Sequence, residues 1–523
     1  MAASPVILMK KYTLLVFCLV LVSAQAGFPY AEATIADLQA QMKSGQLTSA
    51  ALTAAYRARI AEVDRAGPKL NAIIELNPDA LAIAGQMDAE RKAGKVRGPL
   101  HGIPVLLKDN IATADQMETT AGSLALVGAK PLHDAALVAQ LRAAGAVILG
   151  KTNLSEWANF RGKKSISGWS GRGGQTHNPY ALDRNTSGSS SGSAAAVSAN
   201  LSVVAVGSET DGSIVSPASV CGLVGIKPTV GLVSRTGIIP ISASQDTAGP
   251  KARTVRDAAL LLEAMAAADP HDAVTTSRPA GLVTAYAAGL KPGALKGARL
   301  GVIRGPFGLD ARLNLLLDAA LEKMKAAGAE VVEIGEFRDF RKADDPEMEV
   351  LLYEYKDGLN AYFATLGPAS PIKSLADVIA FNRAHAAQEL RDFGQELMEQ
   401  AQAKGPLTEQ AYLDARATCL KATRTEGIDA LLVKYKVDAL VSLSSGPAWL
   451  IDPVNGDAET GGSSSPAAVA GYPDVTVPAG EYRGLPVGIS FYGAAWTEAK
   501  LLALAADFEA AARARKEPTF GRR

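Results

Sequence analysis

One stretch of this chain, from Gly188 to Gly225, constrains its fold and function more than any other. It reads GSSSGSAAAVSANLSVVAVGSETDGSIVSPASVCGLVG, with glycine, alanine and serine where a packed helix or strand would carry larger side chains. Because glycine adopts backbone conformations forbidden to other residues, such a stretch allows several main-chain N–H groups to point at one ligand. Two serines in it are candidate site residues: Ser189 in the first Gly/Ser cluster and Ser213 in the sequence DGSI.

Helical and strand patterns alternate along most of the chain. Apolar residues recur at helical spacing after Thr48, a residue type that favours helix N-caps, and short apolar runs between the helical segments are typical of buried strands. We expect helices over 48–67, 79–93, 134–144, 192–199 and 497–512, and strands over 70–76, 103–107, 147–149, 203–206, 437–443, 474–478 and 485–492. This alternation favours an α/β sandwich with a largely buried sheet.

Residues 343–436 have a different character, with long amphipathic helical stretches and few strand signals. The expected helices cover 347–366, 375–402 and 408–435. Two interpretations remain open. The region is either a helical layer over the sheet or a cap that shapes the substrate entrance.

Residues 1–26 are predicted to be a secretory signal peptide. Lys10 and Lys11 precede an apolar run from Leu14 to Val22, and the sequence AQA at 24–26 is a small-residue cleavage site. The run is short for a bilayer span, which disfavours the alternative of an uncleaved anchor. We therefore expect a mature chain of residues 27–523 that is secreted or periplasmic and has no stable membrane association.

Charge and cysteine content exclude several classes of protein. The net charge is zero, so nothing in the composition favours a nucleic-acid partner or an anionic membrane. Signal cleavage would remove Cys18 and leave Cys221 and Cys419, which are too few for a disulfide scaffold. We expect both to be buried thiols.

Several familiar motifs match this sequence in the wrong context. Gly145–Thr152 fits the phosphate-loop pattern, but its intervening residues read as a strand, which commits their amides to a sheet. Gly188–Gly192 fits the nucleophile elbow G-x-S-x-G, yet only His271 and His385 follow it, and neither is placed as a triad base. The sequence SPIK at 370–373 fits S-x-x-K without its partner motifs. The five histidines lack metal-ligand spacing, so we expect no metal and no cofactor.

A further set of segments carries a resemblance to a known family. They are the strand-like run GIPVLLKDN ending near Lys108, GKTN at 150–153 followed by Glu156, GIKPT at 225–229 and DTAGP at 246–250. With the stretches around Ser189 and Ser213, they resemble the amidase signature family, serine hydrolases that use a Ser–Ser–Lys triad. The resemblance runs from about residue 33 to the C-terminus and implies one large α/β/α domain around a mixed, twisted sheet. Within the family, residues 178–185 and 237–242 are most similar to bacterial peptide amidases, which remove the C-terminal amide of peptides.

The resemblance implies a role for each candidate residue. Ser213 is the nucleophile that forms the acyl-enzyme, and Ser189, after a cis peptide bond to Gly188, bridges it to the base Lys108. Backbone amides of Thr210, Asp211, Gly212 and Ser213 form the oxyanion hole. The chemistry is reasonable because serine needs a base to take its proton, and burial can lower the lysine pKa from about 10.4 toward neutrality.

Three acidic residues complicate this assignment. Asp109 follows the proposed base and would favour its charged form if the carboxylate approached it. Glu209 stands where the family usually has Asp, and Asp211 where it usually has Gly. A side chain at 211 restricts a backbone that should donate to the oxyanion, and we interpret both changes as features of the peptide amidase subgroup.

The predicted function is hydrolysis of carboxamides with release of ammonia, most specifically at the C-terminal amides of peptides. The substrate partner is therefore a small-molecule or peptide amide. One alternative is a general aryl or aliphatic amidase. Another is the glutaminase-like component of a tRNA-dependent amidotransferase, which the signal peptide opposes. A non-catalytic binding protein is a third, opposed by the joint presence of Lys108, Ser189 and Ser213.

We expect the native protein to begin at Gly27 or within a few residues of it, because signal peptidase cuts after small-residue sites such as AQA. N-terminal sequencing of the protein purified from its own cells tests this. A cytosolic protein that retains residues 1–26 would contradict the expectation and strengthen the amidotransferase alternative.

Overall fold

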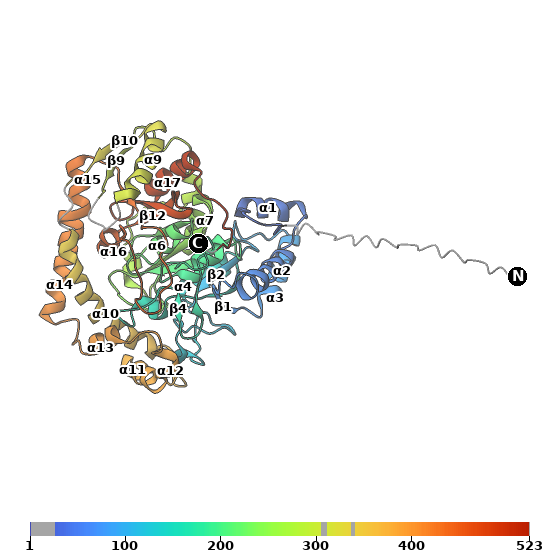
Figure 1. The fold of residues 1–523 in the computed structure, drawn as a ribbon, viewed down its shortest axis with the longest axis horizontal. Coiled ribbons are helices and arrows are strands. Elements are labelled where there is room, and N and C mark those ends of the chain that lie inside the picture. The colour runs from blue at the N-terminus through green and yellow to red at the C-terminus, as the bar shows by residue number, and fades with distance from the viewer. Residues whose placement is uncertain (2–26, 305–310, 336–339, 522–523) are drawn as a thin grey trace. The chain divides into compact units, whose positions relative to one another are not determined.

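An eleven-stranded sheet forms the centre of the unit from Glu32 to Arg523 (Figure 1). The computed structural model describes residues 1, 27–304, 311–335 and 340–521, so the expected signal peptide lies almost entirely outside the described residues. The strand order is β1-β3-β2-β6-β8-β7-β12-β13-β11-β9-β10. The strands are β1 Ile73–Leu76, β2 Pro104–Lys108, β3 Val147–Thr152, β6 Val204–Glu209, β7 Val224–Lys227, β8 Thr247–Ala252, β9 Arg299–Val302, β10 Glu330–Glu333, β11 Ala439–Leu443, β12 Asp474–Tyr482 and β13 Leu485–Tyr492.

The sheet is mixed, and its two kinds of pairing divide it into parts. Strands β3, β2 and β6 pair in parallel, as do β11, β9 and β10. Between these groups, β6, β8, β7, β12, β13 and β11 pair antiparallel. A pair of two-residue strands, β4 Trp169–Ser170 and β5 Gly174–Gln175, forms a separate small sheet. The mixed sheet with flanking helices confirms the predicted α/β fold.

Helices surround this sheet (Figure 1). They are α1 Ile35–Ser44, α2 Ser49–Arg59, α3 Ala80–Lys92, α4 Ala136–Ala143, α5 Ser191–Ser198, α6 Val215–Val220, α7 Val255–Met265, α8 Tyr286–Gly289, α9 Asn314–Ala326, α10 Asp344–Ala364, α11 Leu375–Ala384, α12 Ala386–Glu389, α13 Glu396–Gln402, α14 Gln410–Leu420, α15 Asp429–Tyr435, α16 Ser465–Ala470 and α17 Glu498–Ala512. None in the described part of the chain combines the length and apolar composition that a bilayer span requires. Cys221 and Cys419 are both buried free thiols, as expected.

Local sequence signals explain several of these elements. Thr48 caps α2 by accepting a hydrogen bond from the Ala51 amide, and the helix continues through a π-helical turn, Ile60–Arg65. Strand β2 is buried along its whole length, which matches its apolar sequence.

The phosphate-loop pattern at 145–152 includes β3, so this segment is part of the sheet. Lys151 donates to the Ile111 carbonyl at 2.7 Å inside the core.

The structure interrupts two of the predicted helical stretches. Residues 408–435 form α14 and α15 with a kink at Gly427 between them. Residues 375–402 form α11, α12 and α13 with irregular chain between α12 and α13, and not one continuous helix. The interruption between α12 and α13 coincides with a tertiary contact. The Arg161 guanidinium donates hydrogen bonds to the carbonyl oxygens of Phe393 at 3.1 Å and Gly394 at 3.2 Å, so these carbonyls are not used within a helix. Helices α10 to α15 lie along one side of the sheet in Figure 1, away from α1–α3.

We expect Gly249→Ala to destabilise the protein by about 1–3 kcal/mol, the usual range for an overpacked core. Gly249 lies in β8, where a Cβ atom would sit 1.9 Å from the Ile226 carbonyl oxygen of β7. Chemical unfolding measures the loss. The matched control is Gly85→Ala in α3, where a Cβ meets nothing within 4 Å. That variant should keep or slightly raise the stability, and equal midpoints for both variants would contradict the close approach of β7 and β8.

Candidate active site

Lys108 ends strand β2 in a fully buried position between three oxygen acceptors. Its Nζ donates to Ser189 Oγ at 2.7 Å, to Ser208 Oγ at 2.9 Å and to the Ser208 carbonyl at 3.2 Å. Burial, helped by the nearby Lys251, lowers the pKa of Lys108 well below its usual range, although Asp246 and Glu209 oppose the shift. When the amine is neutral it donates only two of these bonds, and its lone pair accepts the third from a serine hydroxyl. In this place it can take a proton from the Ser189 hydroxyl.

Asp109 does not reach Lys108 with its carboxylate. Its Oδ2 accepts from the Thr120 hydroxyl at 2.5 Å and lies 3.5 Å from an Arg172 nitrogen. The side chain therefore points into a separate buried network. The possibility that Asp109 favours the charged form of Lys108 is not realised, since the carboxylates that act on Lys108 are those of Asp246 and Glu209.

Ser189 is fully buried and follows a cis peptide bond, as the family resemblance implies. Its carbonyl accepts from the Ser155 amide at 3.1 Å, which fixes the backbone here. A Cβ at the preceding Gly188 would lie 2.1 Å from Ser155 Oγ, so only glycine fits. The sequence around Ser189 is therefore small because the backbone packs against a neighbouring loop.

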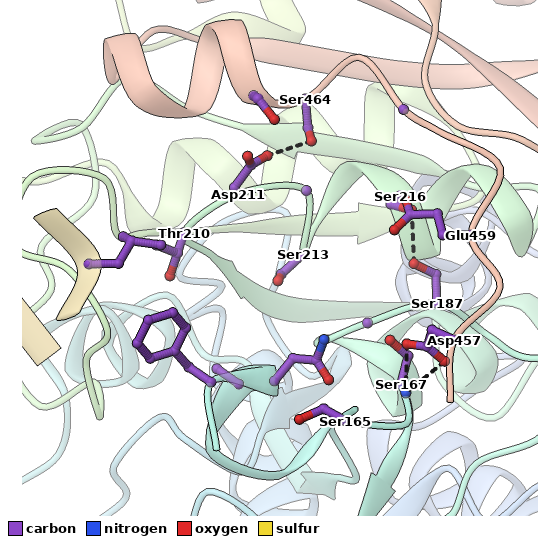
Figure 2. Close-up of a pocket in the computed structure, with 18 of the residues that line it drawn as sticks. Ser165, Ser167, Ser187, Thr210, Asp211, Ser213, Ser216, Asp457, Glu459 and Ser464 are labelled. Atoms are coloured by element: carbon purple, nitrogen blue, oxygen red, sulfur yellow. Dashed lines mark hydrogen bonds between the residues drawn. The ribbon is translucent and has the colours of Figure 1, made fainter. Parts of the chain in front are cut away.

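Ser213 lies in the loop between β6 and α6, with 7 % of its surface exposed, and lines a cavity of about 990 Å³. Figure 2 shows it on the cavity wall near Thr210, with Asp211 on the same loop. Its carbonyl accepts from the Ser190 amide at 3.3 Å, and this hydrogen bond joins the loop of Ser213 to the Gly/Ser cluster. The structure thus brings together the two segments that the sequence singled out.

Glu209 holds the chain that follows Ser213. Its Oε2 accepts from the backbone amides of Ile214 at 2.6 Å and Val215 at 3.0 Å. The side chain is buried, which raises its pKa, while Lys227 opposes that shift. The sequence marked Glu209 as a departure from the family pattern and gave no sign of this role.

Ser190, the serine of the rejected nucleophile elbow, is occupied in the structure. Its hydroxyl donates to the Ser208 carbonyl at 2.9 Å and accepts from the Ser208 amide at 3.2 Å. The side chain is fully buried and does not line the cavity. Its role is to join the Gly/Ser cluster to β6.

Five carboxyl groups line the cavity around Ser213. Among the described residues they belong to Asp211, Asp344, Glu347, Asp457 and Glu459, of which Figure 2 labels Asp211, Asp457 and Glu459. Lys163 and Lys164 also line the cavity. Glu347 comes from α10, the first long helix of the 343–436 region, and accepts from Gln245 at 2.7 Å. Burial and the Asp211 carboxyl hold the pKa of Glu347 well above its usual range. Because these residues are distant in sequence, no local motif could have predicted the acidic wall.

The two stretches that resemble peptide amidases both lie beside this cavity. Residues 237–241 line a second cavity of about 320 Å³, which shares Ala158, Thr210 and Ile241 with the first. In the other stretch, Asn185 donates to Asp457 Oδ1 at 3.1 Å. Both stretches therefore contribute to the surroundings of the cavity, and neither contains Lys108, Ser189 or Ser213.

Comparisons with known proteins identify the family. Residues 51–502 match the family model described as Amidase. The chain belongs to the amidase signature family. Its fold matches the crystal structure of the peptide amidase PAM in complex with the competitive inhibitor chymostatin, with 54 % identity, a TM-score of 0.91 and coverage of 94 % of this chain and 100 % of that one.

Other relatives of this amidase carry names of different kinds. A probable amidase of Arabidopsis thaliana is 43 % identical, over 94 % of this chain and 92 % of its own. A glutamyl-tRNA(Gln) amidotransferase component of Synechococcus is 34 % identical, over 92 % of this chain and 96 % of its own. Native peptide amidase from Stenotrophomonas maltophilia matches with a TM-score of 0.90 and 54 % identity, over 94 % of this chain and 99 % of that one.

We expect Ser213→Ala to lower kcat/KM of this amidase by about three orders of magnitude or more, because the predicted acyl-enzyme forms on the Ser213 oxygen. Ser190→Ala is the matched control and should retain most of the activity if the protein folds. Mass spectrometry after a fluorophosphonate locates the modified serine. An adduct on Ser190 would contradict the assignment and restore the nucleophile-elbow interpretation.

Proposed function

We propose that this amidase hydrolyses the C-terminal amides of peptides to the free peptide and ammonia, through an acyl-enzyme on Ser213. The observation that carries the proposal is the match to peptide amidase, with 54 % identity over 94 % of this chain. The cavity of about 990 Å³ supports it, since that volume is at the upper end for small-ligand pockets and accommodates several residues of a peptide.

In the proposed mechanism, neutral Lys108 takes a proton from Ser189 as Ser189 takes one from Ser213. The Ser213 oxygen attacks the amide carbon, and the oxyanion that forms is held by backbone N–H groups of residues 210–213. The proton on Lys108 returns through Ser189 to the amide nitrogen, which leaves as ammonia. Water then attacks the acyl-enzyme by the same route and releases the carboxylic acid.

The charge of the cavity suits this reaction. A primary amide is neutral and binds without repulsion from the carboxyl groups of Asp211, Glu347 and Glu459. The product is a carboxylate, which an ionised Asp211, on the same loop as Ser213, disfavours by about 1 kcal/mol at a partly solvated site. Product release is therefore favoured over product rebinding, and a peptide that already ends in a carboxylate is a poor ligand.

The alternatives rest on weaker observations. The amidotransferase relative is 34 % identical, against 54 % for peptide amidase, and the predicted signal peptide opposes a place in a cytosolic complex. A general aryl or aliphatic amidase would use the same Lys108–Ser189–Ser213 arrangement, so only the substrate separates it from the proposed function. We also propose a secreted or periplasmic location, on the sequence of residues 1–26.

We expect a short peptide amide to be hydrolysed with a kcat/KM at least about tenfold above that of a simple aryl amide, a difference of about 1.4 kcal/mol in transition-state binding. Ammonia release is measured for both, and for free glutamine as the amidotransferase-type substrate. The same peptide with one further residue in place of the amide should not be cut. Cleavage of that internal bond would overturn the proposal that only C-terminal amides are hydrolysed. A preference for the aryl amide would assign the protein to the general amidases.

A further inference from the structure

A second buried lysine lies next to the proposed base. Lys251, on β8, has no exposed surface. Its side chain runs across β6 at Gly207, since a Cβ built on Gly207 would lie 3.2 Å from Lys251 Cε. Gly207 precedes Ser208, whose two oxygens receive the hydrogen bonds of Lys108. The two lysines thus approach neighbouring residues of the same strand from the strands on either side of it.

Lys251 also contacts the nucleophile loop. Its Nζ donates a short hydrogen bond to the carbonyl oxygen of Ile214, the residue after Ser213. The amide of Ile214 is held by Glu209 at 2.6 Å. The backbone N–H and C=O groups of Ile214 are therefore both held by ionisable side chains, those of Glu209 on β6 and Lys251 on β8.

The charged and titratable groups around the pair determine which lysine keeps a proton. Lys251 is affected by Glu209 on β6 and by Cys221 after α6, and burial lowers its pKa to about 7. Lys108 is affected by Lys251 and, in the opposite direction, by Asp246 and Glu209, and its pKa falls well below the usual range. Two ammonium groups repel each other strongly in such a site, so one proton is retained more easily than two.

We propose that Lys251 is a positioning residue of the Ser–Ser–Lys site: it holds the proton that the two buried lysines share, so that Lys108 stays neutral as the base, and it fixes the loop of Ser213 through Ile214. The proposal rests on the proposed function of Lys108 and Ser213. Its two parts are separable, because the charge acts on Lys108 and the hydrogen bond acts on the loop.

Three substitutions of Lys251 separate charge from hydrogen bonding. Lys251→Arg keeps both, Lys251→Gln keeps a donor without the charge, and Lys251→Met removes both. Each variant of the full chain is labelled with a fluorophosphonate from pH 4.5 to 9, and the rate of modification of Ser213 is followed by mass spectrometry. This readout does not depend on which amide is the substrate. Lys151→Gln is the control, since Lys151 is an equally buried lysine that bonds Ile111 and Thr119.

We expect the acid limb of the pH profile to move up by about one pH unit in Lys251→Gln and Lys251→Met, because removing a like charge raises the pKa of Lys108. At a fixed pH on that limb, labelling then slows about tenfold. Lys251→Arg and Lys151→Gln should keep the wild-type limb, and Lys251→Met alone should also have a lower plateau. A Lys251→Gln profile that superimposes on the wild type while Ser213 is still labelled would overturn the role of Lys251 only. A wild-type protein in which Ser213 is not labelled would overturn the triad and this proposal together.

Discussion

The burial of Lys108 is the constraint on which the site depends. An ammonium group without exposed surface is unfavourable, so the position is tolerated because the amine can be neutral and because its three hydrogen-bonding directions are taken by oxygens of Ser189 and Ser208. The parallel register of β2 with β6, Leu107 opposite Val206, brings Ser208 to the end of Lys108. The sheet therefore positions Lys108, and the Gly/Ser cluster adds Ser189 as a hydrogen-bond partner at its end.

The buried guanidinium of Arg161 links the 343–436 region to the loop beside this site. Arg161 pairs with Glu156 at 2.5 Å and lies 3.6 Å from Glu389, which belongs to α12. Its guanidinium also stacks on Phe393. Glu156, one of the residues that carry the family resemblance, thus has a structural role in this chain. It pairs with Arg161, and Arg161 contacts α12 and the segment that follows it. Helix α10, which packs against α13, brings Glu347 to the cavity.

Sequence reasoning succeeded where the signal was local. Lys108 at the end of an apolar strand follows from a short segment, and the cis bond before Ser189 follows from the family resemblance. Both are present in the structure. It missed β8, because Gly249 and Pro250 are poor strand formers, and with β8 it missed Lys251. The acidic cavity was out of reach for another reason. Its carboxyls come from loops and helices that only the tertiary fold brings together.

Asp211 shows how a departure from the family pattern is accommodated. A side chain at this position would strain the loop if the residue had to adopt a left-handed conformation, but that conformation, with φ of +75°, belongs to Gly212. The Asp211 carboxylate then accepts from the Ser464 hydroxyl at the start of α16 (Figure 2). The Gly/Ser segment 461–465, which reads as low-complexity loop in the sequence, is thereby fixed to the nucleophile loop. An acidic residue two positions before Ser213 thus adds a structural contact that joins this loop to the start of α16.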